Sequence, residues 1–268
     1  MEREAGAIRA RPLDTGLGDR RVELALVTTA PPAVRVEPFE LPPRAQWLRT
    51  RVDWAGFLPE RASGRTWRVQ QVVKRGVDIV LAAAGLVVLL PLFVVVAVLV
   101  KLSSRGPVLY EWRALGYRAR PFVAYKFRTM VVGADARKAE YAAANEMSGP
   151  VFKLRRDPRV TPLGRWLRKF SIDELPQLWS VLKGDMSLVG PRPPLPEEFA
   201  EYEEWQCGKL AVKPGITCFW QVSGRSEISD FRTWARLDLQ YIRAWNLWLD
   251  VRLLLRTIPA VLSGRGAY

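Results

Sequence analysis

An uncharged apolar block, Ile79–Val100, constrains this chain more than any other part of its sequence. As an unbroken helix the block would be roughly 33 Å long, which is enough to cross the hydrocarbon core of a bilayer. A transmembrane helix is therefore the default interpretation. Against it, Pro91 near the middle removes a backbone hydrogen bond, which costs about 3 kcal/mol in an ordinary helix, although membrane helices tolerate proline.

The charges around this block favour a segment that enters and leaves the membrane by the same face. A single span concentrates its basic residues on the cytoplasmic side only. Here basic residues flank both ends: Arg65, Arg68, Lys74 and Arg75 before the block, and Lys101, Arg105, Arg113, Arg118 and Arg120 after it. The flanks therefore favour a re-entrant helix–break–helix over a full span, with each half roughly 15 Å long, about one leaflet deep.

The composition limits the chemistry that the chain can perform. A formal net charge of +14 indicates an anionic partner: nucleic acid, a phosphorylated substrate or anionic lipid. The chain has no histidine, which excludes histidine-based triads and histidine-ligated zinc. Its two cysteines, Cys207 and Cys218, are too few for a structural zinc site or a disulfide framework, so we expect reduced intracellular thiols. Acid–base or metal chemistry falls mainly to carboxylates, which together with phosphate oxygens suit Mg²⁺.

The segments after the apolar block predict small strands and several helices. Short β-prone runs in "GPVLYEWRALGYRARPFVAYKFRTM" predict one or two strands. "GADARKAEYAAANEM" predicts an alanine-rich surface helix, and "DPRVTPLGRWLRKF" leads into another. A helical pattern returns near the C-terminus, with an aromatic strip that suits either a protein core or a membrane interface. The strip consists of Phe231, Trp234, Tyr241, Trp245 and Trp248.

Two acids stand side by side in "SIDELPQLWSVLKG", and local features leave a structural and a functional interpretation of them open. In the structural interpretation, Ser171 and Glu174 form a capping box. Alternatively, a helix begins near Pro176 and closes at Lys183–Gly184, which places both acids at its N-terminus. In the functional interpretation Asp173 is a nucleophile that needs no histidine, and the adjacent carboxylate holds Mg²⁺ or accepts a proton.

Four segments, taken in order and spacing, resemble the bacterial sugar transferase family, the monotopic phosphoglycosyl transferases that begin polyprenyl-linked glycan assembly. They are "KRGVDIV", "KFRTM", "DPRVTPLGRWLRKFSIDELPQLWSVLKGDMSLVGPRP" and "KPGITCFWQVSGR". The resemblance implies an α+β, mostly helical fold in a monotopic membrane protein. It further implies a re-entrant membrane helix–break–helix at 69–104 and a cytoplasmic catalytic domain with small β elements at 105–268. The N-terminal extension at 1–68 precedes the resemblance, and its proline clusters in "TTAPPAV" and "ELPPRAQ" predict broken helices and a partly disordered segment.

The resemblance also implies an activity. Members of this family transfer a phospho-sugar from a UDP-sugar to undecaprenyl phosphate, or another polyprenyl phosphate, and release UMP at the cytoplasmic face of the bacterial inner membrane. This step initiates exopolysaccharide, capsule or O-antigen synthesis. By resemblance, Asp173 is the nucleophile that forms a phospho-aspartyl intermediate, and Glu174 assists Mg²⁺ or the acceptor. Both carboxylates are thus the expected Mg²⁺ ligands.

Four basic residues are implied as the substrate-binding groups of the same site. Arg168 and Arg225 match the phosphate-binding arginines, Arg192 in "GPRP" the nucleotide contact, and Lys126 in "KFRTM" a further cation. The implied partners are the UDP-sugar, undecaprenyl phosphate, anionic lipid of the cytoplasmic leaflet and a possible second copy of the chain, with no nucleic acid.

The sequence departs from the family pattern at a few positions, and it leaves rival functions open. Trp112 and Ala114 stand where many relatives have Gln and Arg, and Leu90 precedes Pro91 where some have Ser. Larger relatives carry a multi-span region and an extra domain, so this chain is expected to be a short form. The rivals are a membrane-bound glycosyltransferase that moves the sugar without its phosphate and releases UDP, and a basic membrane-anchored binding protein. Glucose, galactose and modified hexoses fit equally well.

Overall fold

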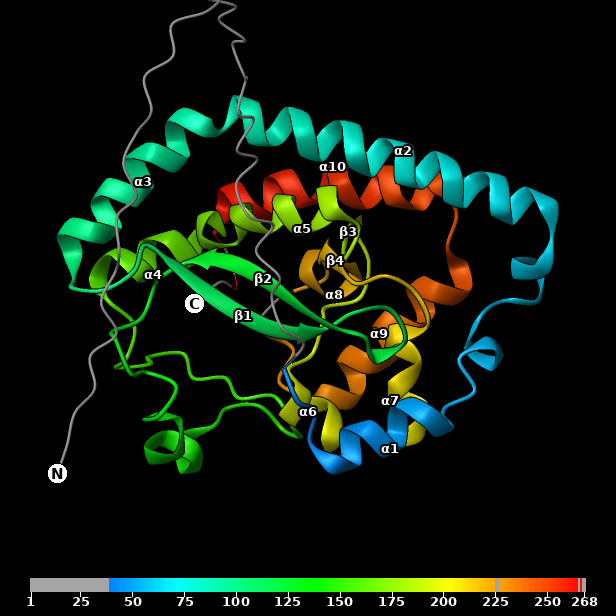
Figure 1. Cartoon of the computed structure of the whole chain (residues 1–268), viewed down its shortest axis with the longest axis horizontal. Coiled ribbons are helices and arrows are strands. Elements are labelled where there is room, and N and C mark those ends of the chain that lie inside the picture. Colours follow the sequence, from blue (N-terminus) through cyan, green and yellow to red (C-terminus); the bar gives the residue numbers. More distant parts are fainter. Residues whose placement is uncertain (1–38, 225–226, 265, 267–268) are drawn as a thin grey trace, which may run out of the picture. The chain divides into compact units, whose positions relative to one another are not determined.

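The computed structural model describes residues 39–224, 227–264 and 266, and this part is mostly helical with two small two-stranded sheets (Figure 1). The predicted α+β class is therefore confirmed. The α-helices are α1 Pro43–Arg51, α2 Arg65–Val88, α3 Leu90–Ser103, α4 Pro162–Lys169, α5 Leu178–Lys183, α6 Pro196–Ala200, α7 Glu204–Cys207, α8 Phe219–Val222, α9 Phe231–Ala244 and α10 Leu247–Ser263. The 3-10 helices are η1 Ala55–Phe57, η2 Glu60–Ser63, η3 Tyr117–Ala119, η4 Lys138–Ala144, η5 Ile172–Gln177 and η6 Gly208–Ala211.

Helices α2 and α3 are the two halves of the apolar block, and they meet at Leu89 with a bend of 59°. The break arises because Pro91, in the first turn of α3, has no amide hydrogen to continue α2. Among the described residues, no single helix is both long enough and apolar enough to cross a membrane. The two helices of the bent pair together have the length and the apolar composition of a broken span or a re-entrant loop. The predicted helix break is confirmed.

One side of the bent pair packs on the rest of the fold and the other side is exposed. Val96 and Val100 of α3 form a buried cluster with Phe127 and Leu167. The outward residues are large and apolar, and such a contiguous exposed surface marks an interaction site. More than half exposed are Val69, Val72, Val80, Val87, Val88, Leu90, Val94, Val95, Val98 and Leu102.

The polar residues of "KRGVDIV" tie α2 to α10, which runs close to it (Figure 1). Lys74 Nζ lies 2.6 Å from Asp250 Oδ2 in α10, and both side chains are largely buried. Asp250 also accepts hydrogen bonds from the Tyr241 hydroxyl (2.8 Å) and the Trp245 indole (3.1 Å). A buried carboxylate with three donors is fully compensated, so this contact fixes one end of α2.

The same motif ties α2 to the elements that follow the acid pair. Arg75 donates to the carbonyls of Val181 (2.6 Å) and Leu182 (2.8 Å) at the end of α5, where a helix presents unpaired acceptors. Asp78, buried in α2, accepts from the amide of Leu188 in a strand (3.0 Å). The three charged residues of this motif, Lys74, Arg75 and Asp78, therefore all make tertiary contacts.

Strands β1 (Leu109–Leu115) and β2 (Pro121–Phe127) form an antiparallel hairpin, which confirms the predicted strands. Tyr110 pairs directly with Lys126. Because directly paired residues share a face and side chains alternate along a strand, Tyr110, Trp112 and Lys126 lie on one face of the hairpin. This face forms a wall of the site described below.

Strands β3 (Ser187–Val189) and β4 (Gly215–Thr217) are parallel and join two of the recognised sequence segments. A Cβ atom on Gly215 would overlap the backbone at Gly190, so the two strands approach this closely only because glycine stands there. Gly190 donates to the Thr217 carbonyl (2.9 Å), and Gly215 donates to that of Pro191 (3.0 Å). The pairing leaves Arg192 directly after the paired residues.

Two parts of the chain differ from expectation. The segment 133–147 forms turns and the 3-10 helix η4 in place of an α-helix. No residue of η4 is buried, and a short alanine-rich stretch without a packed face is marginal as a helix. In the N-terminal region, the cluster Pro42–Pro43 begins α1 where it was expected to break helices, because proline suits the first helical turn.

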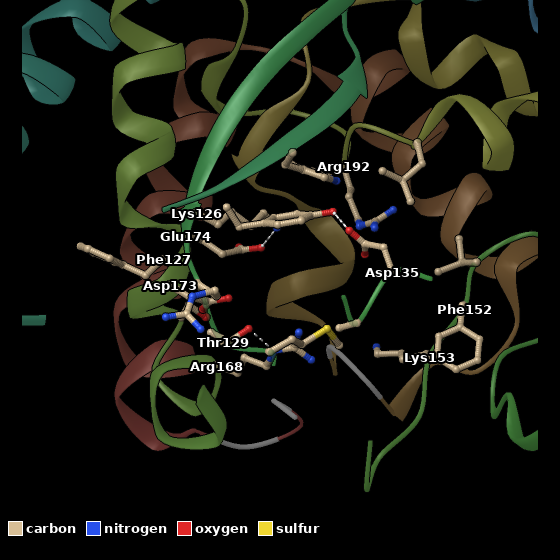
Figure 2. Close-up of a pocket in the computed structure, with 18 of the residues that line it drawn as sticks. Lys126, Phe127, Thr129, Asp135, Phe152, Lys153, Arg168, Asp173, Glu174 and Arg192 are labelled. Atoms are coloured by element: carbon tan, nitrogen blue, oxygen red, sulfur yellow. Dashed lines mark hydrogen bonds and ion pairs between the residues drawn. The ribbon is translucent and has the colours of Figure 1, made fainter. Parts of the chain in front are cut away.

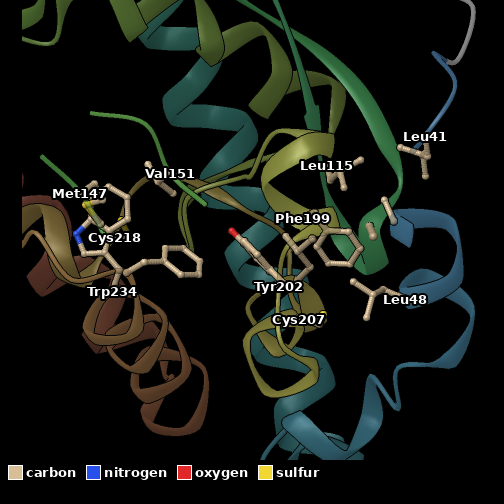
Figure 3. Packing of buried hydrophobic residues seen from close by; sticks show 14 of the residues in the cluster. Leu41, Leu48, Leu115, Met147, Val151, Phe199, Tyr202, Cys207, Cys218 and Trp234 are labelled. Carbon is tan, nitrogen blue, oxygen red and sulfur yellow. The ribbon is translucent and has the colours of Figure 1, made fainter. Parts of the chain in front are cut away.

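Helix α1 contributes to the core, and so does most of the aromatic strip. Leu41 and Leu48 pack in one buried cluster with Phe199 of α6 (Figure 3). Four members of the aromatic strip are buried, while the fifth, Trp248, is 71% exposed. The core interpretation of the strip is therefore confirmed for all but Trp248. Of the extension at 1–68, residues 39–68 form α1, η1, η2 and the start of α2, and residues 1–38 lie outside the described residues.

Candidate active site

A cavity of about 500 Å³ lies against the β1–β2 hairpin and gathers the predicted site residues from distant parts of the chain (Figure 2). Lys126 comes from β2, Arg168 from the end of α4, and the acid pair from η5. Arg192 follows β3. All five line this cavity. The sixth predicted residue, Arg225, lies outside the described residues.

The acid pair occupies the first turn of the 3-10 helix η5, and the capping-box interpretation is wrong. Ser171 is in the left-handed conformation (φ 52°), whereas an N-cap residue is extended. Its amide donates to the Arg168 carbonyl (3.0 Å), so it is not available to a Glu174 side chain. The expected start near Pro176 is close to the observed one, since α5 begins at Leu178. The expected end at Gly184 is confirmed by its left-handed cap (φ 97°).

Lys126 is held between a carboxylate and an aromatic ring. Its Nζ lies 2.7 Å from Glu174 Oε1 and 3.9 Å from the centroid of the Trp112 ring. An ammonium group over an indole face is stabilised by the ring quadrupole. Trp112, one of the departures from the family pattern, is therefore part of the site wall and positions its lysine.

Asp173 is only 8% exposed, and its surroundings set its acidity. Burial, followed by the charge of Glu174, raises the pKa of Asp173 to about 6, against the opposing effect of Lys126 and Arg168. At neutral pH the ionised form still predominates. A carboxylate with a raised pKa is more basic than an ordinary one, so the site holds an ionised carboxylate whose chemistry suits a nucleophile that needs no histidine.

Helix α4 delivers Arg168 to the cavity through local sequence features. Thr161 caps the helix by accepting from the Gly164 amide (2.9 Å), and Pro162 occupies its first turn. Gly164 lies so close to the carbonyl of Thr129 that any side chain would overlap it. At the other end, Arg168 Nε donates to the Thr129 hydroxyl (2.9 Å).

Both arginines keep their charge in the cavity. Burial lowers the pKa of Arg168, with Asp173 opposing the change, yet guanidinium groups in proteins stay protonated. Burial also acts to lower the pKa of Arg192, but Glu198, 3.1 Å away, raises it by more. Arg192 also lies 5.8 Å from the Trp112 ring centroid. Together with Lys126, the two arginines place three positively charged side chains around the acid pair.

Further lining residues were missed by the sequence analysis. The Tyr110 hydroxyl donates to Asp135 Oδ2 (3.1 Å), and burial together with Asp135 raises the pKa of Tyr110 to about 12 (Figure 2). Lys153 Nζ lies 5.0 Å from the Trp234 ring centroid and 5.6 Å from that of Trp220. Strand alternation with Lys126 could have indicated Tyr110. Lys153 lies in a loop, and no motif or periodicity in the sequence singles it out.

The donor atoms in the cavity fit Mg²⁺ only together with a substrate. Within the described ranges, no group of three or more Asp, Glu or Cys side chains could hold a metal ion. Asp173 and Glu174 supply two carboxylates. Mg²⁺ commonly binds through one or two carboxylates, water and the phosphate oxygens of a substrate, so the pair fits an ion that is shared with a phosphorylated ligand.

A buried carboxylate among arginine and lysine side chains makes this a polar cavity whose charges suit a phosphorylated ligand. The chain belongs to the bacterial sugar transferase family, whose pattern matches residues 69–264. The resemblance of the four sequence segments is thereby confirmed.

Three relatives illustrate the match. The galactosyl transferase CpsE of Streptococcus agalactiae is 44% identical over 198 residues, 73% of this chain and 43% of that protein. The exopolysaccharide production protein ExoY of Rhizobium meliloti is 39% identical over 216 residues, 79% of this chain and 95% of that protein. An undecaprenyl-phosphate galactose phosphotransferase of Salmonella typhimurium is 40% identical over 205 residues, 75% of this chain and 43% of that protein. The chain thus spans less than half of CpsE and of the Salmonella protein but nearly all of ExoY.

Proposed function

We propose that this protein transfers a phospho-sugar from a UDP-sugar to undecaprenyl phosphate and releases UMP, as the initiating step of surface polysaccharide synthesis. The observation that carries the proposal is the ionised, buried Asp173 beside Lys126, Arg168 and Arg192 in one cavity. The name of the Salmonella relative supports the acceptor and the reaction type. The name of ExoY supports the biological process.

In the first half of the reaction, an Asp173 oxygen attacks the sugar-bearing phosphorus of the donor. The bond from this phosphorus to the bridging oxygen breaks, and UMP leaves with the electron pair. The products are UMP and a phospho-sugar bound to Asp173 through an acyl phosphate. Arg168 and Lys126 stabilise the negative charge that grows on the phosphoryl oxygens, and Arg192 holds the nucleotide.

In the second half, an oxygen of undecaprenyl phosphate attacks the same phosphorus. The bond to Asp173 breaks, the carboxylate is regenerated, and the product is a sugar linked to undecaprenyl through a diphosphate. Two anions must approach each other in both halves. The cations around the acid pair reduce that repulsion, which is why so basic a site surrounds two carboxylates.

Asp173 and Glu174 would hold Mg²⁺ together with phosphate oxygens of the substrate. The ion would neutralise charge on the diphosphate when bound. Glu174 is paired with Lys126, so this residue has two functions in the proposal: it positions the lysine, and it would be one of the carboxylates that hold the ion.

The bent pair α2–α3 is proposed to enter and leave the bacterial inner membrane from the cytoplasmic face. Three observations support this placement: the exposed apolar side of the pair, the 59° bend at Leu89, and basic residues on both flanks. The exposed flanking residues Arg65, Arg68, Lys101 and Arg105 would contact anionic lipid headgroups of the cytoplasmic leaflet, whereas Lys74 and Arg75 serve the internal contacts described above.

The deciding experiment omits the acceptor. Purified protein is incubated with Mg²⁺ and a panel of UDP-sugars, and released UMP and intact protein mass are measured together. We expect a near-stoichiometric burst of UMP and a phospho-hexose adduct with one donor, and neither with Asp173→Asn. Undecaprenyl phosphate should then discharge the adduct. Release of UDP in place of UMP would overturn the proposal in favour of transfer of the sugar alone.

A further inference from the structure

A second, apolar cavity of about 170 Å³ lies beside the candidate active site. It is enclosed by η5, α5, the β3–β4 pair, α8 and α10, and most of its lining side chains are aliphatic. They include Leu175, Leu178, Leu188, Ile216, Leu254 and Val261. The proposed reaction steps at phosphorus make no use of this cavity.

The apolar cavity meets the active-site cavity at the acid pair. Ser171, Glu174 and Gln221 line both cavities. Asp173 lies between two of these shared residues in the sequence and lines the larger cavity. A ligand that occupied the apolar cavity would therefore reach the reacting carboxylates with one end.

The few hydroxyl groups in the wall are used within the protein. The Oγ1 atoms of Thr217 and Thr257 lie 2.6 Å apart, and Thr257 donates to the Leu253 carbonyl (2.7 Å). Since the Thr257 proton goes to Leu253, Thr217 is the donor of the shared bond. The two threonines thus satisfy each other, and the wall favours an apolar ligand.

The far wall of the cavity belongs to α10, which also carries an exposed apolar stripe. Leu254, Thr257 and Val261 line the cavity. The residue directly after each of these three is more than half exposed: Leu255, Ile258 and Leu262. Positions spaced by three and four residues form one helix face, so the two stripes run side by side along α10. An exposed apolar stripe therefore runs beside the wall of the cavity that Glu174 lines.

We infer that the apolar cavity holds the first isoprene units of the lipid acceptor and brings its phosphate to the acid pair. The inference rests on the proposed function. A donor composed of nucleotide, diphosphate and sugar is polar throughout and belongs in the larger cavity with the cations. The acceptor alone joins a phosphate to a hydrocarbon chain. A narrow space, well below the roughly 300–1,000 Å³ of common ligand pockets, suits the start of such a chain.

The test fills the cavity and measures the two half-reactions separately. Ala260 is partly exposed and lines the cavity, so Ala260→Trp inserts bulk there with little burden on folding. Ala143→Trp makes the same substitution at an exposed position of η4 that lines neither cavity, and it is the matched control. Ile216→Phe fills the same space from β4.

We expect Ala260→Trp and Ile216→Phe to form the phospho-sugar adduct with a normal UMP burst, which also verifies folding. Discharge of the adduct by undecaprenyl phosphate should slow by about tenfold or more, the order of discrimination that an altered apolar pocket produces. Slow discharge by water should not change, and Ala143→Trp should behave like the parent protein. Normal discharge by undecaprenyl phosphate in both cavity variants would overturn the inference.

A second measurement identifies the occupant directly. A polyprenyl phosphate with a photoreactive group on its first isoprene unit should label peptides from α10 or the β4–α8 segment, and undecaprenyl phosphate should compete. Competition by phosphatidylglycerol but not by undecaprenyl phosphate would assign the cavity to a membrane acyl chain and contradict the inference. If the parent protein gave no UMP burst at all, the proposed function itself would fail, which is a distinct result.

Discussion

The ammonium group of Lys126 lies over the ring of Trp112, 3.9 Å from its centroid. Trp112 occupies a position at which the family resemblance leads one to expect glutamine. The indole and the carboxylate of Glu174 hold the lysine from two sides. An apparent departure from the family pattern is therefore a structural element of the site.

Replacement of Trp112 should slow adduct formation by an amount that corresponds to the free energy of this contact. A cation–π interaction contributes about 0.5–2 kcal/mol, so Trp112→Ala should slow adduct formation by roughly 2- to 30-fold. Trp112→Phe should keep most of the rate. Trp47→Ala removes an exposed tryptophan of α1 that does not line the cavity, and this control should have no effect. Equal rates for Trp112→Ala and the parent protein would show that the ring does not position Lys126.

At limiting Mg²⁺, the rate of adduct formation should depend on pH with a midpoint near 6. The proposed nucleophile is the ionised form of Asp173, and burial together with Glu174 raises the pKa of this group to about 6. The rate should therefore rise from pH 5 to pH 7 and then level off. Glu174→Gln removes a cause of the raised pKa and should move the midpoint down. The measurement is the UMP burst recorded across this pH range. An unchanged midpoint in Glu174→Gln would show that the charge of Glu174 does not raise the pKa of Asp173.

Mg²⁺ should shift the same pH profile. A divalent cation between the carboxylates favours the ionised form of Asp173, so saturating Mg²⁺ should lower the midpoint relative to limiting Mg²⁺. EDTA should abolish the burst, and added Mg²⁺ should restore it. A midpoint that is the same at every Mg²⁺ concentration would indicate that the acid pair does not bind the ion.

Loss of the Lys74–Asp250 pair should destabilise the protein strongly. Removal of one partner of a buried pair leaves an uncompensated charge and costs about 3–5 kcal/mol. Lys74→Met should lower the melting temperature in detergent far more than Arg137→Met, which breaks an exposed pair with Glu140. The double variant Lys74→Met with Asp250→Asn should recover part of the loss. Equal melting temperatures for Lys74→Met and Arg137→Met would show that the contact does not anchor α2.

The two ends of the bent pair should face the same side of the membrane. Both native cysteines are buried, which permits single-cysteine labelling at exposed positions. In sealed inverted vesicles, an impermeant thiol reagent should label Ser63→Cys, before α2, and Arg105→Cys, after α3. Labelling of only one of them would establish a full span in place of a re-entrant segment.

Much of the fold could be predicted because it depends on local chemistry. Pro91 broke the apolar block as expected, and strand-forming residues gave the hairpin. The α-helix expected at 133–147 failed because helix propensity without a packed face is too weak to decide the conformation. The capping box failed because the left-handed Ser171 sends its amide to Arg168.

The site was only partly predictable for a related reason. Asp173, Lys126 and Arg192 stand in distinctive segments, whereas the contacts around them depend on packing between distant elements. Tyr110 meets Asp135 only because the hairpin and a later loop come together, and no local pattern announces such a pair. Long-range packing therefore determined the part of the wall that was missed.

The hydrogen bonds from Arg75 to the end of α5 have a mechanical consequence. They join the helix proposed to meet the lipid to the short helix that directly follows the acid pair. A displacement of α2 along the membrane normal is therefore expected to carry α5 with it. The depth to which α2 is immersed would then set the height of Asp173 above the bilayer, so that a phosphate carried on a lipid meets the carboxylate at a fixed level.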